Sequence, residues 1–137
     1  MLKKSNHHYK NILLTGASGF IGSYFLKHYS SVFSINNFSF LKNDIDALNL
    51  NKIDSIVHCA ALVHQMKREP DYDEFYLANV LNTVELAVKA KKNNVKQFIF
   101  LSSVKVYGEE SNTPFNEKSP TNPQDNYGKS KLEAEKK

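Results

Sequence analysis

Short, nearly continuous apolar runs recur along the chain and predict buried strands. Three are clear, at Ile12–Thr15, Ser55–Ala61 and Gln97–Leu101, and a weaker run over Ser31–Ile35 could form a fourth. Continuous rather than alternating hydrophobicity is typical of strands covered on both faces of a parallel sheet. We therefore expect a sheet whose strands lie in the interior of the protein.

Helical patterns fill the segments between these runs. An apolar stripe at helical spacing follows the first strand and comprises Phe20, Ile21, Tyr24, Phe25 and His28. A longer helix is predicted over Tyr72–Lys92, where Leu77, Leu81, Val84 and Val88 recur at intervals of four, three and four. Lysines close this stretch, which suits the negative end of a helix dipole, and Asn93–Asn94 can adopt the left-handed conformation that stops a helix.

A last helix is predicted from Tyr127 onward, where nearly every residue favours helix and Glu133 can pair with Lys137. The stretch Gly108–Gln124 before it holds all but one of the four prolines and is predicted to be loop. Strands that alternate with helices in this order indicate an α/β fold with a doubly wound parallel sheet. Residues 1–10 are predicted to be a polar tail, and residues 11–137 a single domain.

Composition narrows the class of protein. With 137 residues, 41% of them hydrophobic, the chain can build one core but not two. The net charge of +4 comes from scattered lysines, with no helix-turn-helix, RNP or arginine-rich pattern, which argues against nucleic-acid binding. Cys59 is the single cysteine, so neither an intrachain disulfide nor a thiolate metal cluster is possible, and a reducing cytoplasmic setting fits.

No apolar run approaches the ~18 residues that a membrane span needs, and no secretory signal is recognisable at the start. His7 and His8 are most simply part of a solvated tail, and no metal site is predicted.

The first candidate for chemistry is the segment TGASGFIG, Thr15–Gly22, where a strand becomes a helix. Gly16 would allow a sharp turn, Gly19 would leave room for a pyrophosphate, and Gly22 would let the helix pack closely. The backbone N–H groups of that helix would then face the phosphates. The spacing is G-x-x-G-x-x-G, which a plain glycine-rich turn can also produce; the strand–turn–helix context favours the binding interpretation.

The choice between NAD and NADP should depend on the end of the second strand, where an acid favours NAD and an arginine favours NADP. Asn36 and Asn37 stand there instead, so the choice stays open. Asp44 and Ile45 could flank an adenine, and a plain turn before the next strand is an equal alternative.

The second candidate is a serine, a tyrosine and a lysine. Ser102–Ser103 follow the last strand, at the edge of an open α/β sheet where ligands bind. Tyr127 and Lys131 are one helical turn apart, a spacing that composition alone would produce about once. A free tyrosine, with a pKa of ~10, is a poor base at neutral pH, and a nearby ammonium stabilises its phenolate. Ser103 would hydrogen-bond the reacting oxygen as charge develops on it.

Five segments occur together in an order that resembles the extended short-chain dehydrogenases/reductases, the NAD-dependent epimerase/dehydratase family, which acts on nucleotide sugars. They are TGASGFIG, VHCAALVH, Asn79-Val-x-x-Thr83, FLSSVKVYGE and YGKSKLEAE. The resemblance runs from Asn11 to the last residue and implies a Rossmann-like fold. It implies NAD or NADP as cofactor and a nucleotide-sugar substrate, UDP-linked in the closest groups.

The resemblance also implies site residues. The catalytic set would be Ser103, Tyr127 and Lys131, with Lys131 and Tyr127 also reaching the cofactor. The pyrophosphate would be held by Gly16, Ser18, Gly19, Phe20, Ile21 and Gly22. The cofactor cleft would be lined by Cys59, Ala60, Ala61 and Asn79, with Asp44 and Ile45 near the adenine. His64 would lie near the substrate, although a loop histidine without a role fits equally, and Cys59 is also expected to pack as a small apolar residue.

Two departures from the family pattern carry expectations. The link from Gly22 to His58 is short, so the helix between the second and third strands should be missing. The chain stops inside the Tyr127–Lys131 helix, so the domain is expected to be truncated there, without the C-terminal substrate domain.

The function that we predict is a UDP-sugar 4-epimerase or 4-keto-sugar reductase of surface-polysaccharide synthesis. The alternative is a truncated, inactive remnant that retains part of the dinucleotide site. A redox-responsive binding module without catalysis is less favoured, because it would not need Ser103, Tyr127 and Lys131 together. A homodimer is one assembly to expect of full-length members of the family, and the sequence leaves the state of this chain open.

Overall fold

The computed structural model describes residues 11–63, 68 and 70–137, and their contacts divide them into two compact units. The first, which we call the sheet unit, comprises the described residues up to 60 together with residues 86–101. The second, the helix unit, comprises the described residues of 61–85 together with residues 102–137. Each unit is described by itself.

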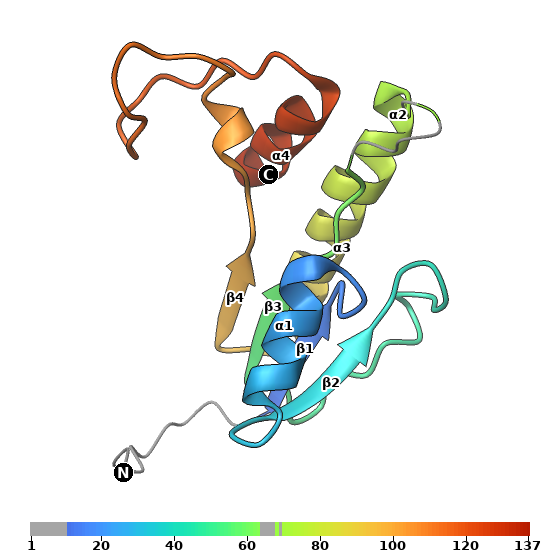
Figure 1. Ribbon diagram of the computed structural model, residues 1–137. Coiled ribbons are helices and arrows are strands. Elements are labelled where there is room, and N and C mark those ends of the chain that lie inside the picture. Colours follow the sequence, from blue (N-terminus) through green and yellow to red (C-terminus); the bar gives the residue numbers. More distant parts are fainter. Residues whose placement is uncertain (1–10, 64–67, 69) are drawn as a thin grey trace, which may run out of the picture. The chain divides into compact units, whose positions relative to one another are not determined.

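Four parallel strands form the sheet unit (Figure 1): β1 (Asn11–Thr15), β2 (Ser34–Phe38), β3 (Ser55–His58) and β4 (Gln97–Phe100). Their order in the sheet is β2-β1-β3-β4, so the chain crosses over between neighbouring strands. Thr15, the last residue of β1, is in register with Phe38 of β2 and His58 of β3. The predicted parallel α/β sheet is therefore confirmed.

Two strand boundaries differ from the prediction. β2 begins at Ser34 rather than Ser31, because the start of the apolar run belongs to the turn after the first helix, where the Phe33 N–H bonds the Tyr29 carbonyl. β3 ends at His58 rather than Ala61, because the Ala60 N–H bonds the side-chain hydroxyl of Thr15 instead of a backbone carbonyl of a neighbouring strand. Apolar runs mark buried chain, and the hydrogen bonds decide where the strand itself stops.

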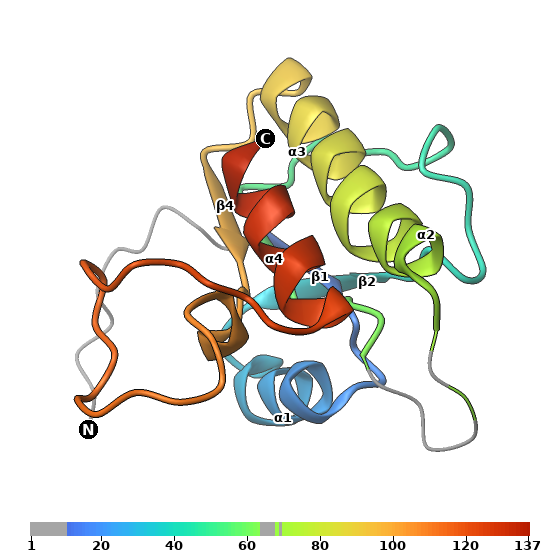
Figure 2. The same ribbon diagram turned by 90° about the horizontal axis from the view of Figure 1, so that it is seen from above.

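Both faces of the sheet are covered (Figure 2). On one face Ile12, Leu14 and Val57 pack with residues of α1 (Phe20–Tyr29), among them Phe25 and Leu26. The other face carries Leu13 and Ile56 against Leu86 and Ala90, which belong to α3 (Asn82–Lys92). This double covering explains why the strands are continuously apolar. The predicted α1 stripe lies partly outside the core, since Phe20 is 93% exposed.

The helix predicted over Tyr72–Lys92 is present as three successive segments. They are α2 (Tyr72–Phe75), a π-helical segment η1 (Tyr76–Leu81) and α3. A capping box of Asp71 and Glu74 starts the stretch, and Asn94 adopts the predicted positive φ of 57° just after it ends.

The apolar stripe predicted for this stretch is on the wrong face. Leu77, Leu81 and Val88 are exposed, whereas the buried positions are Phe75, Asn79, Val80, Thr83, Leu86 and Ala90. The buried positions recur at near-helical spacing, but two of them, Asn79 and Thr83, are polar and have their hydrogen bonds satisfied. A stripe made of apolar residues alone therefore does not mark the buried side.

Residues 39–54, between β2 and β3, contain turns and no helix, as the short link predicted. In the helix unit a 3₁₀ turn, η2 (Val104–Val106), is followed by loop and then by α4 (Asn126–Lys136). Asp125 caps α4 by accepting the Gly128 N–H at 2.6 Å. Among the described residues, no helix has both the length and the apolar character to cross a membrane.

Candidate functional site

The glycine turn of the sheet unit is built so tightly that it excludes side chains. Gly16 has φ = +72°, and a Cβ there would lie 2.6 Å from the Ala60 nitrogen. A Cβ on Gly22 would overlap the Gly16 peptide group, 2.7 Å from its carbonyl carbon. Gly19 is different, because a Cβ on it would meet only the Gly16 oxygen, at 3.3 Å. Gly16 and Gly22 thus permit the turn itself, while Gly19 leaves its outer side open.

The helix that follows this turn presents an uncapped N-terminus. Gly19 is the N-cap residue, no side chain caps it, and the first turn of α1 contains no acidic residue. The Gly19 N–H bonds back to the Gly16 carbonyl at 3.0 Å, which closes the turn. An anion suits such an end, because the helix dipole and the first backbone N–H groups both favour negative charge. Ser18, Phe20 and Ile21 lie in or beside this turn, and all three are exposed.

The ends of β1 and β3 are joined by a buried polar contact that the sequence did not reveal. The Thr15 hydroxyl shares a 2.6 Å hydrogen bond with His58 Nδ1 and accepts the Ala60 N–H at 3.1 Å. Both side chains are buried. Cys59, between His58 and Ala60 in the chain, is half-buried and packs against the apolar cluster that also contains Phe25 and Leu26 of α1. The segment Cys59–Ala60 is thereby held beside Gly16.

The positions tied to the adenosine half have ordinary structural roles. The Asp44 carboxylate accepts the Asp46 N–H in a local turn, and Ile45 packs against the apolar cluster. Asn36 and Asn37 lie inside β2 rather than after it, since the strand continues to Phe38. The expectation that they stand where the strand ends is therefore wrong, and Ser39 follows the strand instead.

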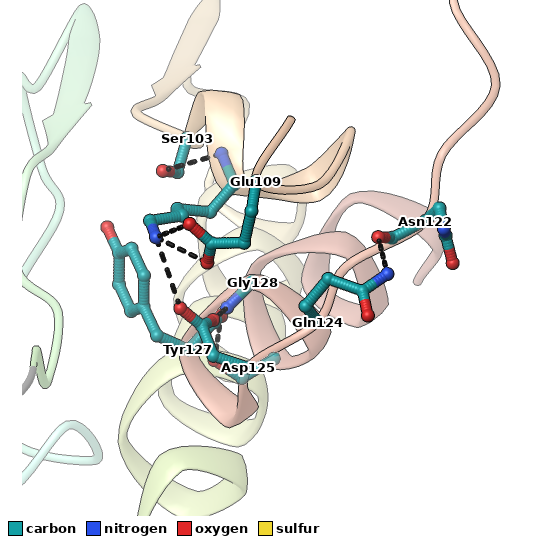
Figure 3. A network of polar contacts seen from close by, with 9 residues as sticks. Ser103, Glu109, Asn122, Gln124, Asp125, Tyr127 and Gly128 are labelled. Atoms are coloured by element: carbon teal, nitrogen blue, oxygen red, sulfur yellow. Dashed lines mark hydrogen bonds and ion pairs between the residues drawn. The ribbon is translucent and has the colours of Figure 1, made fainter. Parts of the chain in front are cut away.

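In the helix unit, Ser103 begins the η2 turn and is held by it. Its hydroxyl accepts the Lys105 N–H at 3.2 Å, and its backbone is extended. A Cβ on Gly128 would lie only 2.7 Å from the Lys105 carbonyl oxygen. The η2 turn can therefore approach α4 closely because this position of the helix is a glycine. The Asn122 N–H also bonds the Val106 carbonyl. These contacts place the serine turn beside the start of α4, the helix that carries Tyr127 (Figure 3).

The Lys105 side chain ties the same two elements together. Its ammonium contacts the Glu109 carboxylate at 2.5 and 2.6 Å and the Asp125 carboxylate at 3.6 Å (Figure 3). The hydrogen bond to Glu109 raises the pKa of Lys105, opposed by desolvation, with further support from the charges of Glu109 and Asp125. Lys105 is partly exposed, so these pairs contribute little to stability by themselves.

Tyr127 and Lys131 lie one turn apart on α4, as predicted. The Tyr127 ring packs on Phe75, with ring centroids 6.4 Å apart. Lys131 is 2% exposed although it is a lysine, which is unusual because burial of an ammonium is costly. The structure brings Ser103, Tyr127 and Lys131 into one unit, with the serine turn against the helix that carries the other two.

Asn79 lies elsewhere in the same unit and is fully engaged. Its side chain accepts the Leu62 N–H at 2.7 Å and donates to the Leu62 carbonyl at 2.9 Å and to Ser130 Oγ at 3.0 Å. Ser130 in turn donates to the Tyr127 carbonyl at 2.8 Å. Asn79 therefore fastens the chain after Ala61 to the first turn of α4. The sequence analysis missed Ser130. Its position next to Lys131 in the segment YGKSK is the signal that could have pointed to it.

A second contact fastens α2 to α4. The Tyr72 hydroxyl donates to the Glu133 carboxylate at 2.6 Å. Burial raises the pKa of Tyr72 to about 12, and the hydrogen bond to Glu133 adds to the effect.

An open cavity of about 420 Å³ adjoins Ser103 in the helix unit. Its walls include Ser102, Tyr107, Phe115 and Glu135. The Ser102 hydroxyl bonds the Glu135 carboxylate, and the rings of Tyr107 and Phe115 stack 5.6 Å apart. His64, expected near a substrate, lies outside the described residues. Within the described part of the chain, no three His, Cys, Asp or Glu side chains gather as metal ligands would.

A sequence model of the NAD dependent epimerase/dehydratase family matches residues 12–137. The chain therefore belongs to this family, as its motifs predicted. A UDP-glucose 4-epimerase of Vibrio cholerae is 36% identical over 149 aligned residues, which cover 93% of this chain and 45% of that protein. This chain thus spans about half the length of the curated relatives that it matches.

Solved structures give the same fold. The UDP-glucuronic acid 4-epimerase of Bacillus cereus in complex with NAD superposes with a TM-score of 0.77 at 27% identity, over 92% of this chain and 50% of that one. A dTDP-4-dehydrorhamnose reductase of Clostridium acetobutylicum superposes with a TM-score of 0.78 at 29% identity, over 92% and 48%. The predicted Rossmann-like fold is confirmed, and only part of the fold of these proteins is present.

Proposed function

We propose that this chain binds NAD or NADP and serves the interconversion or reduction of a nucleotide sugar at C4. The observation that carries the proposal is the glycine turn, in which Gly16 and Gly22 leave no room for a Cβ and α1 begins without a side-chain cap. Such a turn suits a pyrophosphate, and the membership of the family supports NAD as the first candidate.

The residues that would hold the dinucleotide are those of the turn, Ser18–Gly22, with Cys59–Ala60 beside Gly16. Ala61 and Asn79 were also predicted to line the cofactor cleft. The Asn79 amide already bonds Leu62 and Ser130, so Asn79 would act by positioning these neighbours. When bound, the nicotinamide would accept or supply the hydride.

The proton at the C4 oxygen of the sugar would be moved by Tyr127. In the reduction of a 4-keto sugar, Tyr127 gives its proton to that oxygen as the hydride reaches C4, and the product is an alcohol. In epimerisation Tyr127 first takes the hydroxyl proton and later returns it, with the hydride restored to the opposite face. Lys131, buried one turn along α4, would stabilise the phenolate, and Ser103 would donate to the reacting oxygen.

Proteins that this chain resembles are named for both reactions, namely the UDP-glucose 4-epimerase and the dTDP-4-dehydrorhamnose reductase. We propose a UDP-linked substrate, because the relative from Vibrio cholerae is named for one. A role in surface-polysaccharide synthesis and a cytoplasmic location belong to the same proposal.

Titration of the purified chain with NADH and then NADPH, followed by nicotinamide fluorescence, tests the binding step. Gly19→Asp is the matched variant, because a Cβ at Gly19 would need only a small shift of the Gly16 oxygen, 3.3 Å away, while a carboxylate there would repel the phosphates. We expect saturable binding to the unmodified chain and at least about a hundredfold weaker binding to the variant. A folded chain that binds neither dinucleotide would contradict the proposal.

Turnover is tested separately, with a UDP-4-keto-hexose and NADH or NADPH, by the loss of absorbance of the reduced nicotinamide. Tyr127→Phe should remove turnover and leave dinucleotide binding within about threefold, since the ring and its packing on Phe75 are kept. Binding without turnover in the unmodified chain would favour the alternative, an inactive remnant that retains part of the dinucleotide site.

A further inference from the structure

One buried polar group in the sheet unit has no part in the proposed chemistry. Thr15 and His58 end neighbouring strands, in register with each other, and are 0% and 1% exposed. Burying a hydroxyl and an imidazole in a core is costly unless their hydrogen bonds are made. A valine at Thr15 would fill the same space without that cost, so the polar pair calls for a reason other than packing.

The geometry of the pair identifies what it holds. Thr15 Oγ1 accepts the Ala60 N–H at 3.1 Å and lies 2.6 Å from His58 Nδ1. A hydroxyl has one hydrogen, and with one lone pair occupied by Ala60 the arrangement that uses this hydrogen directs it to Nδ1. The hydroxyl is then committed on both sides, and its direction is set by the imidazole.

The imidazole itself is held by aromatic rings. The centroids of Phe40, Phe98 and Phe100 lie 5.9, 6.0 and 5.8 Å from that of His58. These rings come from the segment after β2 and from β4, so two further elements restrict the ring. Because the ring is restricted, its hydrogen bond with the Thr15 hydroxyl favours one rotamer of Thr15. That rotamer in turn favours one position of the Ala60 N–H, which bonds the same hydroxyl.

Ala60 is the residue against which Gly16 is packed. The Ala60 nitrogen and Cα lie 2.6 and 2.9 Å from the place of a Gly16 Cβ, so a shift of this segment by a fraction of an ångström changes the glycine turn directly. Gly16 also accepts the Gly19 N–H that closes the turn. The path from His58 to the start of α1 is thus a chain of direct contacts within one unit.

We propose that Thr15 and His58 are positioning residues of the dinucleotide site. Their hydrogen bonds keep Cys59–Ala60 against Gly16 and so preserve the shape of the turn that receives the pyrophosphate. The inference rests on the proposed binding of NAD or NADP, and it adds two residues that touch neither the phosphates nor the reacting atoms.

The test compares Thr15→Val, which removes the hydroxyl, with Thr15→Ser, which keeps it. His58→Phe is a second variant, because a phenyl ring suits the aromatic surroundings and cannot make the bond to Thr15. Ile56→Val, in the core of β3, is the control for ordinary loss of packing. For each variant and for the unmodified chain, the measurements are the affinities for NADH and for ADP-ribose and the hydrogen-exchange rate of the Ala60 amide.

We expect Thr15→Val to weaken both NADH and ADP-ribose by about tenfold or more and to speed exchange of the Ala60 amide by a similar factor. In Thr15→Ser both the affinities and the exchange rate should stay within about threefold of the unmodified chain. His58→Phe should give values between those of Thr15→Ser and Thr15→Val. Ile56→Val should lower the unfolding midpoint and leave the affinities unchanged, because it removes one buried methyl group and no hydrogen bond of Thr15 or Ala60.

Unchanged affinity and unchanged Ala60 exchange in folded Thr15→Val would overturn the inference. Equal losses of affinity in Thr15→Val and Ile56→Val would also overturn it, by showing that general destabilisation is the cause. If the unmodified chain binds no NADH, the proposed function fails, while the exchange of Ala60 still decides whether Thr15 holds this segment.

Discussion

The two units hold their functional residues by different means. In the sheet unit the turn works through the absence of side chains, and apolar packing on both faces of the sheet fixes its backbone. In the helix unit the important groups are side chains, and hydrogen bonds fasten the elements that carry them, through Asn79, Ser130 and Tyr72. The glycine turn should therefore respond most strongly to added atoms, and the elements of the helix unit should respond most strongly to lost hydrogen bonds.

The largest effect should come from adding one methyl group to the glycine turn. Gly22→Ala would place its Cβ against the Gly16 peptide, whereas Gly19→Ala would meet only the Gly16 oxygen at 3.3 Å. We expect Gly22→Ala to lower the free energy of unfolding by about 2–4 kcal/mol, as overpacking against backbone does. Gly19→Ala should change it by less than about 1 kcal/mol.

Urea unfolding of the two variants measures this difference. The comparison uses the same substitution three residues apart, so side-chain size is matched. Helix propensity favours alanine at Gly22, inside α1, over alanine at Gly19, the N-cap, so propensity alone would give the opposite order of stability. Equal stability of the two variants would show that the turn can relax, and that the sheet unit does not depend on close backbone approach.

An intermediate effect is expected from Asn79→Ala in the helix unit. The substitution removes three hydrogen bonds and leaves the Leu62 N–H and carbonyl without their partner. We expect a loss of about 2–3 kcal/mol, because buried polar groups left unsatisfied are costly. Hydrogen exchange should show faster exchange at Leu62 and in the first turn of α4, with little change in β1 and β3.

Asn122→Ala is the matched control. The bonds of Asn122 to Val106 and Gln124 use its backbone N–H and carbonyl, so removal of the side chain should cost less than about 0.5 kcal/mol. Equal losses for Asn79→Ala and Asn122→Ala would contradict the view that side-chain hydrogen bonds organise this unit.

The smallest effect concerns the Tyr72–Glu133 contact and depends on pH. The pKa of Tyr72 is raised to about 12, so the unfolded chain releases this proton first, from about pH 10, while the folded chain still holds it. The free energy of unfolding should therefore fall as the pH rises from about 10 to about 12. Below that range the contribution of Tyr72 is fully present.

Urea unfolding of Tyr72→Phe and of the unmodified chain at several pH values isolates this contribution from the other tyrosines and lysines. The variant should be less stable at neutral pH by about 1 kcal/mol or less, since the group is largely solvated. Between about pH 10 and about pH 12, the variant should lose less stability than the unmodified chain. Parallel pH curves for both chains would show that the contact with Glu133 does not persist in solution.

Much of the fold was predictable because it depends on patterns in adjacent residues. Continuous apolar runs identified three strands, and the helix from Tyr127 was correct to within one residue. The stripe at Leu77, Leu81 and Val88 failed because part of the buried face is polar, at Asn79 and Thr83. Asn36 and Asn37 were misplaced because pairing with β1 extends β2 to Phe38.

For the site, the order of motifs predicted the glycine turn and the Ser103, Tyr127 and Lys131 set, whose roles stay predictions. The contacts of Thr15 with His58, and of Asn79 with Ser130, join residues 43 and 51 positions apart. No local pattern in the sequence marks such pairs, because each member alone has an ordinary explanation.

The sequence by itself determined the family, the alternation of strands and helices, and the residue types available for chemistry. These follow from local spacing, hydrophobic pattern and motif order, which are properties of neighbouring residues. Only the tertiary structure decided which face of the Tyr72–Lys92 stretch is buried, which residue packs on Gly16, and which polar groups are paired in the core. The physical reason is that packing and buried hydrogen bonds depend on atoms brought together from distant parts of the chain, so their energies are set by the whole fold.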